Sequence, residues 1–150
     1  LILMKNLLFV LILSSPIFGF SQEIQRINSN EHLEKNRPFS QATIVNNVIY
    51  LSGQIGTLPN SKLISGGIEA ETRQTLINIK TLLDSMGLSM GDVFKCTCIL
   101  EDIKDFSKMS EIYTTFFEKK KKPARTTFAA SGLAAGAKLE IECMALMSSD

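Results

Sequence analysis

The stretch that decides the fold runs from residue 69 to residue 100 and reads EAETRQTLINIKTLLDSMGLSMGDVFKCTCIL. Its first half repeats apolar residues three and four positions apart, which predicts a helix over residues 69–86 that Gly87 is placed to end. Its second half predicts a strand over residues 92–100, because alternate side chains are apolar. The expected helix stripe is Leu76, Ile79, Leu83 and Met86, and the expected strand face is Phe94, Cys96, Cys98 and Leu100.

Two shorter strands precede this unit and two follow it. Residues 40–45 and 48–52 are rich in β-branched and apolar residues and meet at Asn46 and Asn47. Because asparagine tolerates positive φ, this pair predicts a tight hairpin turn. Residues 125–130 and 138–147 predict the last two strands, and a short strand is expected near residues 24–27.

A second helix is expected over residues 105–118, with Asp105 as its N-cap. Two helices packed on one mixed sheet predict an α+β domain of two layers. The other face of the sheet keeps apolar side chains that no helix covers, so we expect oligomerisation. The expected buried stripe of this helix is Phe106, Met109, Ile112, Tyr113 and Phe116.

The first twenty-one residues have the pattern of a signal peptide. Lys5 follows a natural start at Met4, residues 7–13 are apolar, and small residues at 19 and 21 suit peptidase cleavage before Gln22. The apolar run is short for a spanning helix. We therefore expect one mature domain over residues 22–150, with a periplasmic or secreted location and no membrane contact after cleavage. The alternatives are a buried N-terminal helix or an uncleaved anchor, and a cytoplasmic location if the segment does not function.

The net charge argues against two classes of partner. Removal of residues 1–21 takes away one lysine and no acid, which leaves the remainder with zero net charge. A general nucleic-acid binder carries a basic footprint, so neither nucleic acid nor an anionic membrane surface is expected as a partner. The lysine run at residues 119–122 is interpreted as a solvated cluster at a helix end, with an RNA- or polyanion-binding spot as the alternative.

The three cysteines are Cys96, Cys98 and Cys143. Cys96 and Cys98 lie two apart on one expected strand, about 7 Å from each other, which is the limit for a disulfide. Cys143 could reach one of them only if the two strands are neighbours. We interpret all three as small core residues, with disulfides as the alternative in an exported protein. Zinc is not expected, because the spacing is wrong and His32 is the only histidine.

Few residues offer chemistry. Arg125 stands at the start of a strand, and its planar guanidinium pairs bidentately with carboxylates. Glu140 and Glu142 share one face of the next strand, where one of them could hold or activate a water. The alternatives are a structural ion pair between Arg125 and one of these acids, and a merely polar strand face. The turn at Ser52, Gly53 and Gln54 has no phosphate-loop lysine, although its amides could contact a ligand.

These residues, taken together, resemble the RidA (YjgF) family of reactive-intermediate imine and enamine deaminases. The resemblance covers residues 36–147, and the order and spacing of its motifs are specific although each motif alone is weak. It further includes Asp105 and Phe106, Tyr113, and Phe116 with Phe117. The motifs are PFSQA at 38–42, LSGQI at 51–55, ETRQTLINIK at 71–80, GDVFKCT at 91–97, PAR at 123–125 and LEIE at 139–142.

The resemblance implies a chorismate-mutase-like α+β fold and a homotrimer with ligand clefts between subunits. It implies hydrolysis of 2-iminopropanoate or 2-iminobutanoate to the 2-oxo acid and ammonia, without metal or organic cofactor. Arg125 would bind the substrate carboxylate and Glu140 would position the attacking water. Phe39 and the strand end at Ser52, Gly53 and Gln54 would line the cleft.

The chain departs from the family pattern at four positions. Phe39 replaces a cleft tyrosine and lacks its hydroxyl, and Arg37 replaces a glycine beside it. Ser110 stands where the second helix carries a cleft asparagine, and Ala134 replaces a loop proline. These changes allow a second hypothesis, a non-catalytic trimer that binds a small carboxylate or a protein partner. An RNA-cleaving or RNA-binding protein is a third.

Overall fold

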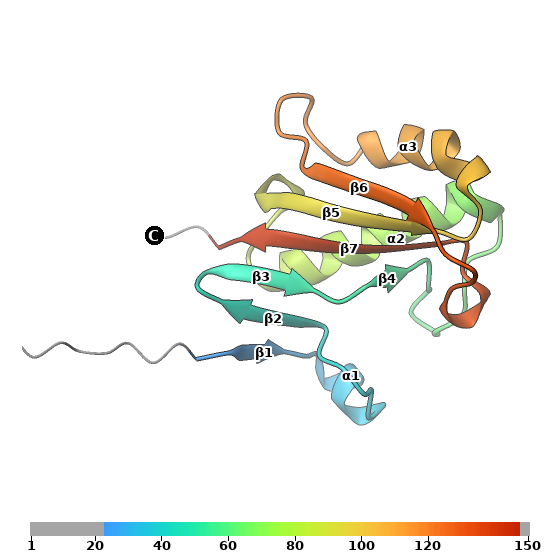
Figure 1. The fold of residues 1–150 in the computed structure, drawn as a ribbon. Helices are drawn as coiled ribbons and strands as arrows, with labels where there is room; N and C mark the ends of the chain where they lie inside the picture. The colour runs from blue at the N-terminus through green and yellow to red at the C-terminus, as the bar shows by residue number, and fades with distance from the viewer. Residues whose placement is uncertain (1–22, 148–150) are drawn as a thin grey trace, which may run out of the picture.

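A long helix covers one face of a seven-stranded sheet in the computed structural model, which describes residues 23–147 (Figure 1). The expected signal peptide at residues 1–21 lies outside these residues. The order β1-β2-β3-β7-β5-β6 places the last strand in the middle, and β4 also pairs with β7. The strands are β1 (Gln25–Ile27), β2 (Ala42–Val45), β3 (Val48–Leu51), β4 (Gln54–Ile55), β5 (Val93–Leu100), β6 (Ala124–Ala129) and β7 (Leu139–Leu146). The α-helices are α1 (Asn30–Glu34), α2 (Gly67–Ser85) and α3 (Phe106–Thr114), and the 3-10 turns are Met90–Asp92, Ile103–Asp105 and Ala134–Gly136.

The α+β prediction is confirmed, and the sheet is mixed. Only β5 and β6 run parallel; every other pairing is antiparallel. The expected α2 stripe is buried, with Leu76, Ile79 and Leu83 inaccessible to solvent and Met86 partly buried. Gly87, at a φ of 76°, donates to Asp84 and ends the helix as predicted.

The hairpin between β2 and β3 also forms as predicted. Asn46 and Asn47 occupy its two turn positions with φ values of 52° and 62°. Positive φ at both positions is the requirement of the turn that matches the twist of two antiparallel strands. The short strand β1 pairs with β2 and confirms the expected N-terminal strand, whereas α1 and the two-residue strand β4 were not predicted.

The expectation for Phe94 is wrong. A bulge between Val93 and Lys95 shifts the register of β5 against β7, so Val93 is buried and Phe94 is 44% exposed. The remaining members of the expected face are buried, because the alternation is regular after the bulge. One extra residue on a strand reverses the face of the residues before it, which alternation alone does not reveal.

The second helix is shorter than predicted. It ends at Thr114, and Asp105 makes no side-chain cap hydrogen bond. Asp102 instead caps the preceding turn by accepting from the Lys104 amide at 2.9 Å. The lysine run at residues 119–122 therefore lies beyond the helix, where Lys121 forms an exposed ion pair with Glu118 at 3.3 Å.

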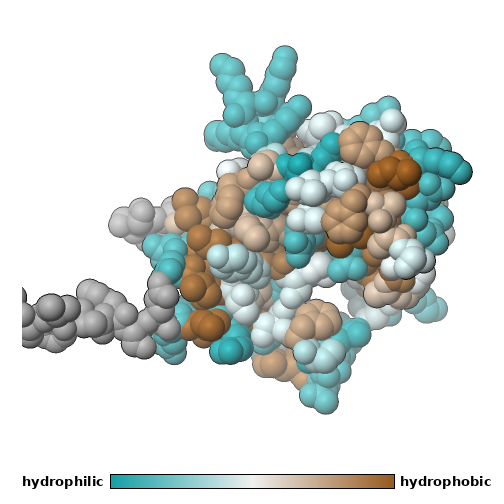
Figure 2. Space-filling view, viewed as in Figure 1, coloured by the Kyte–Doolittle hydropathy of each residue, from teal (hydrophilic) through white to brown (hydrophobic). Residues whose placement is uncertain are grey.

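The face of the sheet opposite α2 carries exposed apolar side chains (Figure 2). They include Tyr50 on β3, Phe128 on β6 and Leu146 on β7, each 41–51% exposed. We call this surface the open face. No helix of residues 23–147 is both long enough and apolar enough to cross a membrane.

Candidate functional site

Glu140 lies on the open face, with its carboxylate packed against the backbone of Gly53. Its neighbours Leu139 and Ile141 are fully buried on the helix side of β7, so alternation directs Glu140 to the other side. A Cβ added to Gly53 would lie 1.9 Å from Glu140 Oε1. Only glycine allows this approach, which places the carboxylate beside the predicted strand end.

Ser52 and Gln54 hold this strand end in place. The Ser52 hydroxyl donates to the Ser40 carbonyl at 2.7 Å, and its amide donates to the Gln41 carbonyl at 3.0 Å. The Gln54 side-chain amide donates to the Ser52 carbonyl at 3.2 Å, while its backbone pairs with Ile141. These bonds fix the loop between β3 and β4 on which Gly53 lies.

Phe39 lies one residue from this network but does not point into it. Its ring is 51% exposed and meets the His32 ring edge-on at 5.3 Å. His32 Nε2 is 2.5 Å from the Phe39 carbonyl oxygen. Phe39 lines a hollow formed by residues 28–40 that contains neither Glu140 nor Arg125. Within one chain, Phe39 is linked to the Gly53 loop through its neighbour Ser40, whose carbonyl accepts a hydrogen bond from the Ser52 hydroxyl.

Arg125 lies against the aromatic rings of α3. Its guanidinium carbon is 4.8 Å from the centre of the Tyr113 ring and 5.3 Å from that of Phe106. A guanidinium at these distances gains a cation–π attraction, which is stronger where water is excluded. Tyr113 is buried, whereas Phe106 is 40% exposed. The two rings form a shelf that holds the cation while leaving it half-exposed.

Arg125 and Glu140 lie on opposite faces of the sheet. Arg125 is the register partner of Cys96, which is buried on the helix side, whereas Glu140 is the partner of Ile99 on the open side. The strand β5 also separates them. Within one chain, the sheet therefore separates the Arg125 side chain from those of Glu140 and Glu142. Among residues 23–147, Arg125 forms no ion pair with either acid, so the alternative of a structural pair is not supported.

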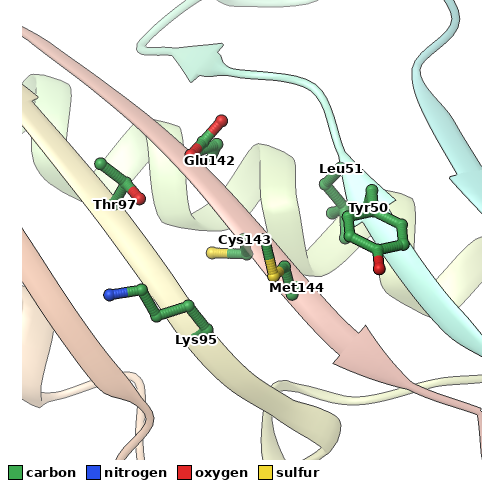
Figure 3. A pocket seen from close by; sticks show the side chains of 7 residues that line it. All are labelled: Tyr50, Leu51, Lys95, Thr97, Glu142, Cys143 and Met144. Atoms are coloured by element: carbon green, nitrogen blue, oxygen red, sulfur yellow. The ribbon is translucent and has the colours of Figure 1, made fainter.

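Glu142 shares the open face with Glu140 and lines a small hollow that does not include Glu140 (Figure 3). Lys95 also lines it, yet its ammonium group points to β6 and donates to the Thr126 hydroxyl at 2.6 Å. The hollow holds about 50 Å³, enough for no more than a water or two. Its lining residues are Tyr50, Leu51, Lys95, Thr97, Glu142, Cys143 and Met144.

The three cysteines are free and buried, as predicted for core residues. The strands β5 and β7 are neighbours, and Cys96 and Cys143 are register partners with sulfurs 2.8 Å apart. The hydrogen bond from Cys143 lowers the pKa of Cys96, and the same bond together with burial raises the pKa of Cys143. Burial raises the pKa of Cys98 to about 12.

Sequence reasoning missed the aromatic shelf. Phe106 and Tyr113 were assigned to the buried stripe of the helix. Tyr113 is buried, whereas the expectation for Phe106 is wrong because that side chain is exposed. Their spacing of seven residues puts both rings on one face of α3, a pattern that core packing produces equally well. Only the parallel pairing of β5 with β6 brings Arg125 over them. Within residues 23–147, no group of three His, Cys, Asp or Glu side chains could hold a metal ion.

Comparisons with known proteins identify relatives along most of the chain. A family model described as endoribonuclease L-PSP matches residues 29–147. The human 2-iminobutanoate/2-iminopropanoate deaminase is 42% identical over 110 residues, which span 73% of this chain and 80% of the human protein. A crystal structure of Escherichia coli TdcF with bound serine has a TM-score of 0.69 at 31% identity, covering 75% of this chain and 90% of that one. The Escherichia coli YjgF product has a TM-score of 0.68 at 31% identity, covering 74% of this chain and 89% of that one.

Proposed function

Because this chain belongs to the endoribonuclease L-PSP family, which is the RidA (YjgF) family, we propose that it is a RidA-type deaminase. Its substrate would be a small 2-imino acid such as 2-iminopropanoate or 2-iminobutanoate, and its products the 2-oxo acid and ammonia. The name of the human relative supports this substrate class. The observation that carries the proposal is the Glu140 carboxylate packed on Gly53 beside the fixed Ser52 loop.

In the proposed reaction Arg125 binds the substrate carboxylate and Glu140 orients a water toward the imine carbon. Protonation of the imine nitrogen makes this carbon electrophilic, so one anchored substrate and one positioned water suffice. The water oxygen bonds to the carbon, Glu140 accepts its proton, and the resulting carbinolamine expels ammonia to leave the 2-oxo acid. This chemistry requires neither a metal nor an organic cofactor. The serine bound to TdcF is likewise a small molecule with a carboxylate.

We propose that two copies of the chain complete each site. Arg125 and Glu140 face opposite sides of one sheet, so the two groups can meet only across a contact between subunits. The exposed Tyr50, Phe128 and Leu146 side chains on the open face supply apolar area for such a contact. A homotrimer with three interfacial clefts satisfies both requirements, with Phe39, Ser52, Gly53 and Gln54 as proposed lining residues.

An imine-hydrolysis assay tests the proposal. A dehydratase generates 2-iminobutanoate in the cuvette, and the protein should accelerate its loss over buffer. Arg125→Ala and Glu140→Gln should abolish the acceleration while the sedimentation profile stays unchanged. Glu142→Gln is the matched control, because Glu142 occupies the same strand and face two residues away and should retain activity. An intact oligomer without acceleration would overturn the deaminase proposal.

Binding measurements on the same protein samples distinguish the other two candidate functions. Calorimetric binding of 2-oxobutanoate without turnover would support a carboxylate-binding module, for which the missing Phe39 hydroxyl is the favouring observation. The description of the matched family as an endoribonuclease keeps RNA as a third candidate. Salt-dependent RNA binding that is lost on replacing the lysines at 119–122 would favour it.

We also propose export to the periplasm or the medium, based on the sequence pattern of residues 1–21. The N-terminal mass of the protein recovered from the cell envelope and medium tests this. A chain that begins at Gln22 supports export, whereas an intact N-terminus on protein found only in the cytoplasm contradicts it.

A further inference from the structure

The thiols of Cys96 and Cys143 lie opposite each other near Tyr113, the residue whose ring packs against the proposed carboxylate anchor Arg125. Cys96 on β5 and Cys143 on β7 are direct antiparallel partners, and their sulfurs are 2.8 Å apart. Opposite residues on antiparallel strands have Cα atoms about 4.5–5.5 Å apart, which lies within the range that disulfides span. The pair therefore needs little backbone movement to become a bond.

Cys98 does not share this arrangement. It lies on the same strand and the same face, but its partner on β7 is Ile141 rather than a cysteine. The strand pairing therefore places Cys96 and Cys143 opposite each other and leaves Cys98 without a partner thiol. Cys98 then serves as the control thiol within the same chain.

We propose that Cys96 and Cys143 are a redox modification site, at which a hydroperoxide converts the two thiols into one cross-strand disulfide. This bond would change the surroundings of Tyr113, whose ring contacts the Arg125 guanidinium. The Cys96 sulfur attacks hydrogen peroxide, forming a sulfenic acid and releasing one water. The Cys143 sulfur then attacks the Cys96 sulfur and displaces a second water. Two thiols lose two electrons and two hydrogens, and one peroxide is reduced to two waters.

The surroundings assign different roles to the two sulfurs. The Cys143 hydrogen bond lowers the pKa of Cys96 against the opposing effect of burial, with smaller contributions from Tyr113, Arg125 and Lys95, so Cys96 is the attacking sulfur. The pKa of Cys143 is raised, so it remains protonated and reacts in the second step, with the sulfenic acid of Cys96. Cys98 is as buried as Cys96, but Ile141 rather than a cysteine stands opposite it, and burial raises its pKa to about 12.

Tyr113 connects the thiols to Arg125. Its hydroxyl lies close to Cys96, and the side chain is only 3% exposed. Its ring carries the guanidinium at 4.8 Å. Bond formation brings the Cys96 sulfur closer to the Cys143 sulfur on β7 and so alters the contact between Cys96 and the Tyr113 hydroxyl. The oxidation stands independently of the proposed function, whereas its effect on substrate binding rests on that function.

Mass spectrometry of the full 150-residue chain tests the disulfide. The chain is treated with hydrogen peroxide, denatured and alkylated; we expect one alkylated cysteine of the three and a cross-linked peptide joining Cys96 to Cys143. Cys98→Ala should form the same link, and Cys143→Ala should form none. Dithiothreitol should restore all three thiols. Three alkylated thiols after oxidation, or a link that involves Cys98, would overturn the assignment.

Tyrosine emission tests the coupling without any enzyme assay. The sequence has no tryptophan and two tyrosines, so Tyr50→Phe leaves Tyr113 as the sole fluorophore. We expect its emission to fall on oxidation and to recover with dithiothreitol, and to stay unchanged when Cys143→Ala is added. A disulfide without an emission change would overturn the coupling to Tyr113, and this result does not depend on whether the protein hydrolyses imines.

Discussion

The guanidinium carbon of Arg125 lies 4.8 Å from the centre of the Tyr113 ring, on the side of the sheet away from Glu140. An arginine on an edge strand would otherwise sample many rotamers in water. The aromatic ring gives it one preferred position at the rim of the helix layer. The proposed carboxylate anchor is therefore set by a contact between α3 and β6, independently of the acid that would orient the water.

Phe106→Leu should weaken carboxylate binding. The substitution removes the exposed ring of the shelf, whose attraction for the cation is worth about 0.5–1 kcal/mol, or roughly two- to five-fold in affinity. Titration calorimetry with 2-oxobutanoate measures the effect. Phe106→Tyr keeps an aromatic ring and should bind as the unaltered protein does; equal weakening in both variants would show that the ring is not responsible.

Gly53→Ala should slow deamination while the protein stays folded. The added Cβ would meet Glu140 Oε1 at 1.9 Å, so the carboxylate must leave its position. We expect a fall in kcat of about tenfold or more, because a misplacement on the order of 1 Å strongly reduces catalysis.

The matched control for this change is Gly132→Ala. A Cβ at Gly132 meets nothing within 4 Å, and its activity should be unchanged. Full activity in Gly53→Ala would show that the observed position of Glu140 is not needed for the reaction.

Glu71→Ala should destabilise the fold by about 1–3 kcal/mol. The buried Glu71 carboxylate accepts a hydrogen bond from the Lys138 amide at 2.8 Å at the start of β7, and its removal leaves that amide without this acceptor. Urea unfolding at constant m-value measures the loss. Glu69→Ala removes an exposed carboxylate from the same helical turn and should cost about 0.5 kcal/mol or less; similar losses in both variants would mean that the hydrogen bond contributes little.

Alkaline pH should reduce stability through Cys98. Burial raises its pKa to about 12 in the folded protein, whereas an unfolded cysteine titrates near 9. Between these values the unfolded chain releases a proton that the folded chain keeps, so stability is complete below pH 9 and falls above it by about 1.4 kcal/mol per pH unit.

Urea titrations at pH 8, 9, 10 and 11 (the tested range, roughly spanning the two pKa values) check this slope. Cys98→Ala should show a shallower decline than the unaltered chain over the same range. Parallel declines in the two proteins would assign the alkaline loss to other groups, such as Tyr113, whose pKa burial also raises.

Phe39→Tyr should improve substrate binding. The new hydroxyl supplies a hydrogen bond that the phenyl ring lacks, worth about 0.5–1.5 kcal/mol, or roughly two- to twelve-fold in KM. Phe94→Tyr adds the same group to another half-exposed ring and should leave KM unchanged. If Phe39→Tyr has no effect, position 39 does not face the substrate in the assembled protein.

Much of the fold follows from local patterns. The stripe of α2 and the Asn46-Asn47 hairpin were predicted because each depends on neighbours in the chain and on the backbone preferences of single residues. The exposed Phe94 was not, because the bulge is settled by the pairing of β5 with β7, and the early end of α3 at Thr114 does not show in the apolar periodicity. The residue types and their spacing supplied Arg125, Glu140 and Glu142 as candidates, and the resemblance to a family gave roles to Arg125 and Glu140. Neither gave their placement on opposite faces of the sheet.

The sequence by itself determined which residues are available: one arginine at the start of a strand, two glutamates on one face of another, a glycine between Ser52 and Gln54, and three apolar thiols. Alternation along a strand assigns each of these to a face relative to its own neighbours. Alternation does not show which side of one strand lies on the same face of the sheet as a given side of the neighbouring strand. Only the tertiary structure decided that Arg125 shares the helix side with Cys96 and Tyr113 while Glu140 shares the open side with Gly53, because that depends on the β6-β5-β7 register.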